Sequence, residues 1–274
     1  MIPVVVGSSP IGHPSLAPRR WRAPTLRGAT PPAAFKAVLE AALAQIETNA
    51  RGVLESSDPE FLHQLRVGLR RLRSALRAFR KILPKKPVNG LARSLRELSP
   101  KLGAARDWDV LVERLKGRED LRISAQRQRE AARKTAQRAI SSKRFARVLR
   151  QARLLVAAKT TESLAQFGAA AMTRTHRKLL KRARGIEWSD AAARHAVRIR
   201  VKRLRYTCEL FAPTRASPYV AALKELQEIL GELNDIAVGR RLIGFEADES
   251  ALLRRLGAAW KRFARRPVFW RAAG

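Results

Sequence analysis

The amino-acid sequence predicts an all-α protein composed of two related halves. Apolar residues recur at helical spacing along most of the chain, and no segment alternates between apolar and polar residues as strands do. The pairs Ser57-Asp58 and Ser189-Asp190 are good helix N-caps, and Pro59 follows the first pair in a favoured first-turn position. With 274 residues, of which 46% are hydrophobic, the chain can bury an ordinary packed core.

Each half is expected to contain four helices in the same order. In the first half, residues 33–139, we expect helices at about 33–54, from Pro59 through the histidine-containing segment, through 95–107 and near 119–139. In the second half, residues 162–265, we expect them at about 162–184, after Asp190, through 223–235 and near 248–265. Between the halves, Ser141-Ser142 can cap a connecting helix at about 142–157.

Two kinds of interruption are also predicted. Residues 84–90, PKKPVNG, are rich in proline and glycine and predict a linker. Residues 102–107, LGAARD, and residues 230–235, LGELND, predict a helix boundary or kink at which Gly103 and Gly231 permit close approach of another group. Asp107 and its counterpart Asp235 are expected to hold basic partners in place.

The two halves are related by an internal repeat. Residues 63–79, HQLRVGLRRLRSALRAF, align without gaps on residues 195–211, HAVRIRVKRLRYTCELF, so that His63 meets His195 and Phe79 meets Phe211. A second block follows, in which LRELSPKLGAARD at 95–107 aligns on LKELQEILGELND at 223–235. The duplication indicates two copies of one helical unit.

The repeated helix carries a basic stripe. At 100° per residue, one face about 80° wide holds His63, Arg66, Arg70, Arg73 and Arg77, and it rises over about 21 Å. The leucines of the same helix fall on a separate face, about 120° away. The second copy repeats the stripe with His195, Arg198, Lys202 and Arg205, whereas Glu209 stands in the position of the fifth cation.

The charge of the chain indicates an anionic partner. Against 23 acidic residues stand 57 basic residues, most of them arginines, for a formal net charge of +34. A solvated charged face is the ordinary explanation of one basic helix, but no acidic residue lies between His63 and Lys86 to neutralise the stripe. Two such stripes facing each other across a pseudo-two-fold axis would form a basic groove or pore suited to a polyanion.

The two stripe histidines are expected to donate to phosphate oxygens. A metal site is the alternative, but cations follow each histidine three, seven and ten residues later, so we expect neither a metal nor a cofactor. The stripes supply no carboxylates of the kind that a phosphohydrolase would need for its metal ions, so we expect no enzymatic activity. A second tier of candidate binding residues comprises Arg77, Arg96, Arg106 and Lys224.

Residues 1–32 contain several prolines and no acidic residue, which predicts a flexible basic arm. The single cysteine, Cys208, excludes an internal disulfide and favours a reducing compartment such as the cytoplasm. No apolar run approaches the roughly 20 residues that span a bilayer, so we expect no membrane insertion.

These blocks together resemble the CHAD family, the conserved histidine α-helical domain. The resemblance covers residues 33–270 and includes LGAARDWDVL at 102–111 and the closing segment AAWKRFARRPVFW. It implies two pseudo-symmetric four-helix bundles around a basic central cavity that binds inorganic polyphosphate. The binding positions that it implies are His63, Arg66, Arg70, Arg73, His195, Arg198, Lys202 and Arg205.

The resemblance further implies a cytoplasmic protein located on polyphosphate granules, with granule proteins as a further class of partner. No Glu-x-Glu-x-Lys motif of a fused triphosphate tunnel domain occurs, so the chain is similar to the stand-alone form. The alternative function is nucleic-acid binding by the same basic surface. Because no recognition-helix turn, zinc finger or stacking aromatic is evident on the stripe, such binding is expected to be non-specific.

Overall fold

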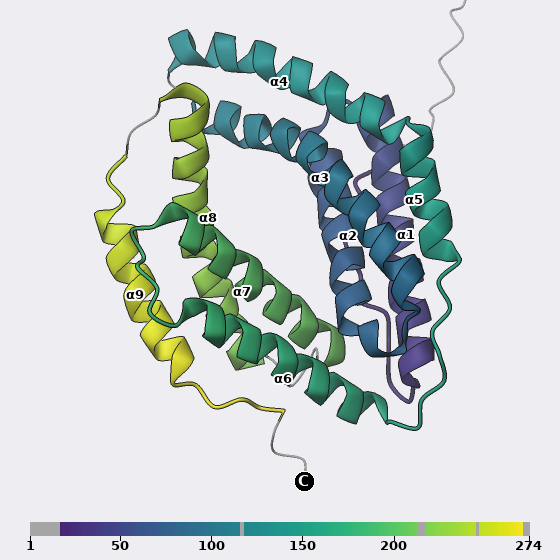
Figure 1. Cartoon of the computed structure of the whole chain (residues 1–274). Coiled ribbons are helices and arrows are strands. Elements are labelled where there is room, and N and C mark those ends of the chain that lie inside the picture. The colour runs from purple at the N-terminus through teal and green to yellow at the C-terminus, as the bar shows by residue number, and fades with distance from the viewer. Residues whose placement is uncertain (1–16, 116–117, 213–216, 245–246, 271–274) are drawn as a thin grey trace, which may run out of the picture.

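The chain folds into helices, as predicted. A computed structural model describes residues 17–115, 118–212, 217–244 and 247–270, and within these ranges no strand occurs. The helices are α1 (Pro31–Glu55), α2 (Pro59–Ala78), the 3-10 turn η1 (Arg80–Ile82), α3 (Lys85–Arg114), α4 (Glu119–Ile140), α5 (Lys143–Arg153), α6 (Leu164–Ala183), α7 (Ala191–Phe211), α8 (Ser217–Ile243) and α9 (Ser250–Ala264) (Figure 1). None of these helices combines the length and hydropathy needed to cross a bilayer.

The helix starts follow the predicted caps. The Asp58 carboxylate accepts a hydrogen bond from the backbone N–H of Glu60 at 2.8 Å, which fixes the start of α2. Asp190 likewise accepts from the N–H of Ala192 at 2.8 Å at the start of α7. The Ser142 hydroxyl accepts from a backbone N–H of the connecting helix α5. Because these contacts are local, the sequence alone was sufficient to predict them.

The predicted interruptions are wrong as helix boundaries. Residues 85–90 form the first turns of α3, in which Pro87 is tolerated because first-turn N–H groups have no helical acceptor. Gly103 lies inside α3, and Gly231 lies inside α8. The axis of α3 changes direction along its length, in keeping with the predicted kink (Figure 1). Pro100, in the helix interior, lacks the N–H for a helical hydrogen bond and accounts for the bend.

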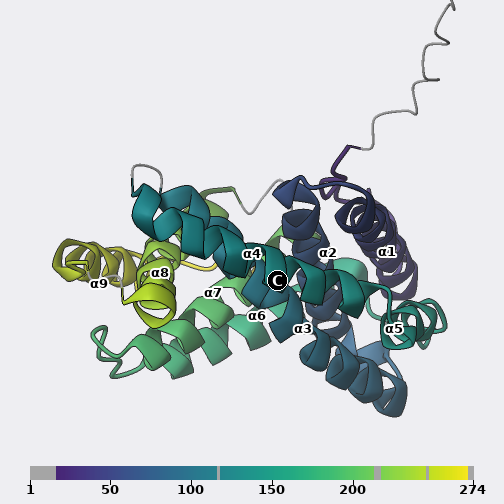
Figure 2. The ribbon, with the colours of Figure 1, turned by 90° about the horizontal axis from the view of Figure 1, so that it is seen from above.

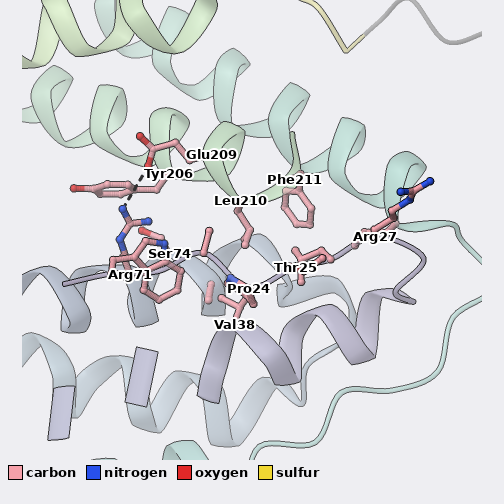
Figure 3. A pocket seen from close by; sticks show the side chains of 15 residues that line it. Pro24, Thr25, Arg27, Val38, Arg71, Ser74, Tyr206, Glu209, Leu210 and Phe211 are labelled. Carbon is pink, nitrogen blue, oxygen red and sulfur yellow. Dashed lines mark ion pairs between the residues drawn. The ribbon is translucent and has the colours of Figure 1, made fainter. Parts of the chain in front are cut away.

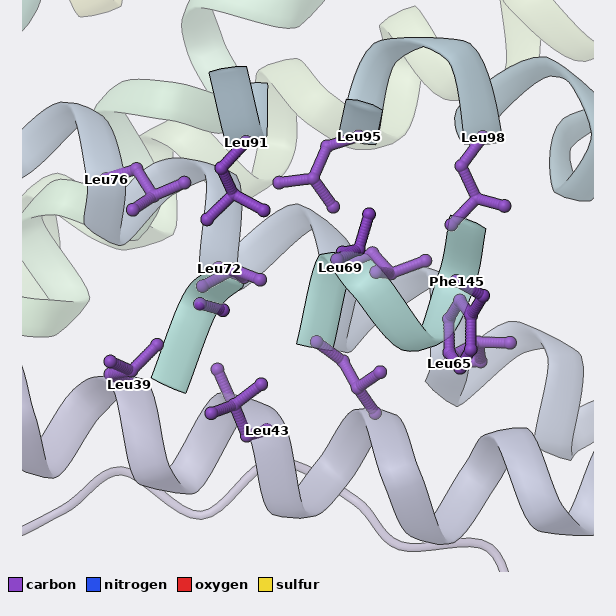
Figure 4. Packing of buried hydrophobic residues seen from close by; sticks show 14 of the residues in the cluster. Leu39, Leu43, Leu65, Leu69, Leu72, Leu76, Leu91, Leu95, Leu98 and Phe145 are labelled. Carbon is purple, nitrogen blue, oxygen red and sulfur yellow. The ribbon is translucent and has the colours of Figure 1, made fainter. Parts of the chain in front are cut away.

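The first half packs on the leucine face of α2. Leu65 and Leu72 are completely buried, and leucines of α1 and α3 interdigitate with them from either side (Figure 4). Phe145 of α5 adds to the same core. The predicted apolar face of this helix is therefore confirmed.

The second half forms its own core from α6, α7, α8 and α9. Val201 and Cys208 of α7 are fully buried in it, together with leucines of α8 and Phe263 of α9. Cys208 is thus a core residue, as expected. His176 lies edge-on to the ring of Trp270 and belongs to this packing.

The two halves are joined where α2 lies against α7 and α3 lies against α8. Seen from above, α1, α2, α3 and α5 lie on one side and α6 to α9 on the other, with α4 between them (Figure 2). At one end, the rings of Phe79 and Phe211 meet Phe35 and Phe167 in a shared aromatic cluster. This arrangement brings the C-terminal ends of the two histidine-containing helices together, and the helices diverge toward their other ends (Figure 1).

Residues 17–30, expected to belong to a flexible arm, are instead docked on the first half. The backbone N–H of Arg19 donates to Asn49 Oδ1 at 3.1 Å, and Asn49 Nδ2 donates back to the Arg19 carbonyl at 2.8 Å. Trp21 and Leu26 pack against the first core. Burial of these apolar side chains and pairing of the buried Asn49 amide order the segment. Residues 31–32 of the predicted arm begin α1, and residues 1–16 lie outside the described residues.

Candidate functional site

Four cations converge between α2 and α7. We call Arg66 and Arg70 of α2, with Arg198 and Lys202 of α7, the central cluster. Burial, and then repulsion by Arg198 and Arg70, lower the pKa of Lys202 to about 6. Arg66 repels Lys202 as well, while the Asp235 carboxylate acts in the opposite direction. Burial is the larger cause of this low pKa, and the positive charges of the neighbouring arginines add to it.

The side chain of Arg66 reaches the cluster past Gly103. A Cβ atom at Gly103 would lie only 3.1 Å from Arg66 Nη1, so the glycine permits the close approach that the sequence suggested. No atom lies within 4 Å of the corresponding position at Gly231, so the same reasoning does not explain that glycine. Burial lowers the pKa of Arg66 to about 10, and attraction to Asp107 partly offsets this effect.

Hydrogen-bond donors of the central cluster lack protein acceptors. The Nε atoms of Arg70 and Arg198 are buried, and neither has a hydrogen-bond partner among the described residues. A cavity of about 350 Å³ is lined by Arg66, Arg198 and His195 and by the carboxylate of Asp107, whereas Arg70 is not among its lining residues. A buried donor without an acceptor is energetically unfavourable, so an anion in this cavity would relieve the cost at Arg198.

Each stripe histidine lies near the third helix of its half. His195 Nδ1 is 3.1 Å from Asn234 Oδ1 on α8. Burial, and then repulsion by Arg106 of α3, lower the pKa of His63. Arg106 and Asn234 occupy matched positions in the repeat. Arg106, a second-tier residue, is therefore close enough to His63 to lower the pKa of its imidazole.

The two matched aspartates hold arginines across the junction of the halves, as expected. Asp107 of α3 lies 3.5 Å from Arg241 of α8, and Asp235 of α8 lies 3.1 Å from Arg114 of α3. The four side chains are partly exposed, so these ion pairs contribute little to the free energy of unfolding. Their effect is to position α3 and α8 beside the central cluster.

The stripe of α2 continues beyond the central cluster. Arg73 donates a hydrogen bond to Ser99 Oγ at 3.1 Å, and repulsion from Arg96 adds to the burial that lowers its pKa. Arg73, Arg77 and Arg96 line a small cavity of about 170 Å³. Lys224, the remaining second-tier residue, is exposed on α8 and lines neither this cavity nor the one beside His195.

Arg205, another binding position that the sequence predicted, lies beside Glu209 on α7. Its Nε atom is 3.6 Å from Glu209, and its guanidinium carbon is 4.9 Å from the centroid of the Tyr206 ring. Arg71 pairs with the same carboxylate at 3.6 Å and stacks on Trp21 (Figure 3). Glu209 therefore offsets part of the positive charge at this end of the α7 stripe, because its one carboxylate lies near two guanidinium groups.

Sequence reasoning missed a group of cations on the far side of this helix pair. Arg200 and Arg203 of α7 lie in one cavity with Arg77 of α2 and with Arg174 and Lys178 of α6. Arg203 is matched to Arg71 in the repeat. This match between two cations was the sequence feature that could have indicated these positions as candidate binding residues. In the described part of the chain, no group of three or more His, Cys, Asp or Glu side chains is placed to hold a metal ion.

Comparison with known proteins gives a consistent result. Residues 37–244 match the family model of the CHAD domain. The crystal structure of the CHAD domain from the plant Ricinus communis is similar, with a TM-score of 0.73 and 35% sequence identity over 93% of this chain and 94% of that one. PptA from Streptomyces chartreusis shares the fold, with a TM-score of 0.60 and 17% identity over 85% of this chain and 97% of that one.

A curated relative is an uncharacterised protein of Mycobacterium tuberculosis. It is 32% identical over an alignment of 203 residues that covers 65% of this chain. The matched region spans 39% of the length of that relative.

Proposed function

Because the chain belongs to the CHAD domain family, we propose that it binds inorganic polyphosphate in the central cluster and does so without catalysis. The observation that carries this proposal is the convergence of Arg66 and Arg70 with Arg198 and Lys202, around buried donors that lack acceptors. A linear anion that carries charged oxygen atoms on every unit can accept hydrogen bonds from such donors.

The shape of the site favours a linear ligand over a single phosphate ion. Along α2, the cations from Arg66 to Arg77 extend over about 16 Å, a span of several phosphate groups. The proposed contacts are His63, Arg66, Arg70, Arg73, His195, Arg198 and Lys202. Arg205 is the eighth proposed contact, because its buried Nε atom also has no hydrogen-bond partner among the described residues, although Glu209 lies 3.6 Å away. Binding draws its free energy from counter-ion release and from charge-assisted hydrogen bonds.

The proposed setting is the surface of polyphosphate granules in the cytoplasm, where granule proteins would be neighbouring partners. Nucleic acid is a competing ligand on charge alone, because the net charge is +34. In this site, however, the ring of Tyr206 lies within 5.5 Å of the Arg70 guanidinium and is not a free platform for base stacking.

Competition between the two polyanions tests the proposal. Labelled long-chain polyphosphate is bound to the full chain and then challenged with duplex DNA at equal phosphate concentration. We expect the polyphosphate to stay bound, and its displacement by DNA would contradict the proposal. In parallel, no phosphate release is expected when magnesium or manganese is added, and sustained release would contradict the absence of catalysis.

A further inference from the structure

A second cationic cavity lies on the side of α2 and α7 that faces α6. Its volume is about 270 Å³, and we call it the α6 cavity. The described residues that line it include no acidic side chain, and they include six cations: Arg77, Arg80, Arg174, Lys178, Arg200 and Arg203. These cations come from four elements, α2, η1, α6 and α7, which the fold brings together.

The cations are the available hydrogen-bond donors of the α6 cavity. Three hydroxyl groups also line it, those of Ser74, Thr175 and Thr207. Each of them donates to a backbone carbonyl of its own helix, at 2.8 to 2.9 Å. A ligand in this cavity would therefore meet guanidinium and ammonium groups, which suit phosphate oxygens.

On the opposite side of the α2–α7 pair, a carboxylate compensates part of the positive charge. There, Arg71 pairs with Glu209 and its guanidinium lies 4.5 Å from the centroid of Trp21 and 5.1 Å from that of Tyr206 (Figure 3). In the repeat, Arg203 matches Arg71 and Arg77 matches Glu209. The α6 cavity thus holds two cations where its counterpart holds an ion pair.

The concentration of charge in the α6 cavity is unfavourable in the free protein. Burial, and then repulsion by Arg200 and Arg73, lower the pKa of Arg203. Partial burial and repulsion by Arg203 likewise lower the pKa of Arg77, to about 9, although Arg77 keeps solvent-exposed surface. Because Arg80 and Lys178 are also exposed, an anion can enter the cavity from solvent.

We propose that the α6 cavity is a second binding site for condensed phosphate, separate from the central cluster. A long chain would pass from the central cluster by way of Arg73 and Arg77 into this cavity, and that path rests on the proposed function. Occupation of both sites by one chain raises affinity through effective concentration, without new contacts at either site. A short condensed phosphate would fill each site independently.

Isothermal titration calorimetry with tripolyphosphate and with long-chain polyphosphate tests the inference. We expect wild type to bind two equivalents of tripolyphosphate, and we expect Arg77→Gln/Arg203→Gln to bind one. The pair Arg174→Gln/Lys178→Gln, on α6, replaces a half-buried and an exposed cation and should weaken the same equivalent by about tenfold. It serves as the second variant if the first does not fold. The control is Arg255→Gln/Lys261→Gln, which removes two exposed cations of α9 and should behave as wild type.

The outcomes separate the second site from the first. If both cavity variants bind tripolyphosphate and long-chain polyphosphate as the control does, the α6 cavity is not a site and the inference fails. If Arg66→Gln/Arg198→Gln retains full binding while the cavity variants lose it, the proposed function fails and the inference stands. If the cavity variants lose only tripolyphosphate binding, the α6 cavity binds a separate short phosphate. If they lose affinity for tripolyphosphate and for long-chain polyphosphate, the cavity binds part of the long chain.

Discussion

The rings of Phe79 and Phe211 lie 5.2 Å apart, with 54° between their planes, where α2 and α7 end. These two residues are matched in the internal repeat, so each histidine-containing helix ends in a phenylalanine that contacts the other. Phe167 of α6 stacks on Phe79 at 5.6 Å. The contact fixes one end of the helix pair.

Phe79→Ala should therefore weaken the whole fold. Phe79 is completely buried, and removal of a buried phenylalanine ring costs about 3–5 kcal/mol of unfolding free energy. Urea unfolding followed by circular dichroism measures the loss. The control is Leu154→Ala, since Leu154 is 73% exposed and its truncation should change stability by less than about 0.5 kcal/mol. Equal losses for the two variants would contradict the role of the aromatic cluster.

Two glycine-to-alanine substitutions test the packing at this junction, one beside Phe211 and one as a control on α8. A Cβ atom at Gly168 would lie 2.8 Å from Phe211 Cβ, whereas one at Gly231 would meet no atom within 4 Å. Gly168→Ala should destabilise the protein by about 1–3 kcal/mol through overpacking. Gly231→Ala should stabilise it by up to about 1 kcal/mol, because alanine favours a helix interior. Thermal unfolding of both variants checks the opposite signs.

Binding of polyphosphate should be linked to proton uptake. In the free protein, burial and neighbouring cations lower the pKa of Lys202 to about 6, so its side chain is mostly neutral at pH 7. A bound polyanion raises this pKa, so affinity should increase as pH falls from 8 to 6. Calorimetry in buffers of different ionisation enthalpy measures the protons taken up.

Lys202→Arg is the matched variant for this measurement, because arginine stays charged and should remove most of the uptake. Burial also lowers the pKa of His63, so the residual uptake is expected to come from this histidine. Equal uptake by wild type and Lys202→Arg would exclude Lys202 as its source.

The same lysine should make the free protein more stable at higher pH. Its pKa is about 6 in the folded protein and about 10.4 in an unfolded chain, so between these values the unfolded state binds more protons. Stability contributed by this group therefore rises as pH increases through that window. Lys202→Met should raise the Tm more at pH 6 than at pH 9, and the reverse order would contradict the assignment.

Local features of the fold were predictable because they depend on neighbouring residues. Asp58 and Asp190 cap their helices as the sequence indicated, and the leucine face of α2 is buried. The start of α3 was missed because Pro87 is compatible with a first helical turn, although proline and glycine are typical of linkers. Docking of residues 17–30 was missed because it depends on Asn49, which is distant in sequence.

The candidate site was predictable in part for a similar reason. Helical geometry placed Arg66 and Arg70 on one stripe, and the repeat supplied their partners on the second helix. The substitution of Glu209 for the fifth cation was visible in the sequence, but its ion pair with Arg71 depends on how α2 and α7 cross. The cavity beside α6 also depends on this crossing, so its cations could not be assigned from helix periodicity.

The most direct test of the central claim is the salt dependence of polyphosphate affinity for wild type, Arg66→Glu, Arg198→Glu and the double variant. If cations of both helices hold one chain, each single reversal should reduce the slope of log Kd against log salt concentration by about 1, and the double variant should reduce it further. A double variant that keeps the slope of wild type would contradict a shared site between α2 and α7.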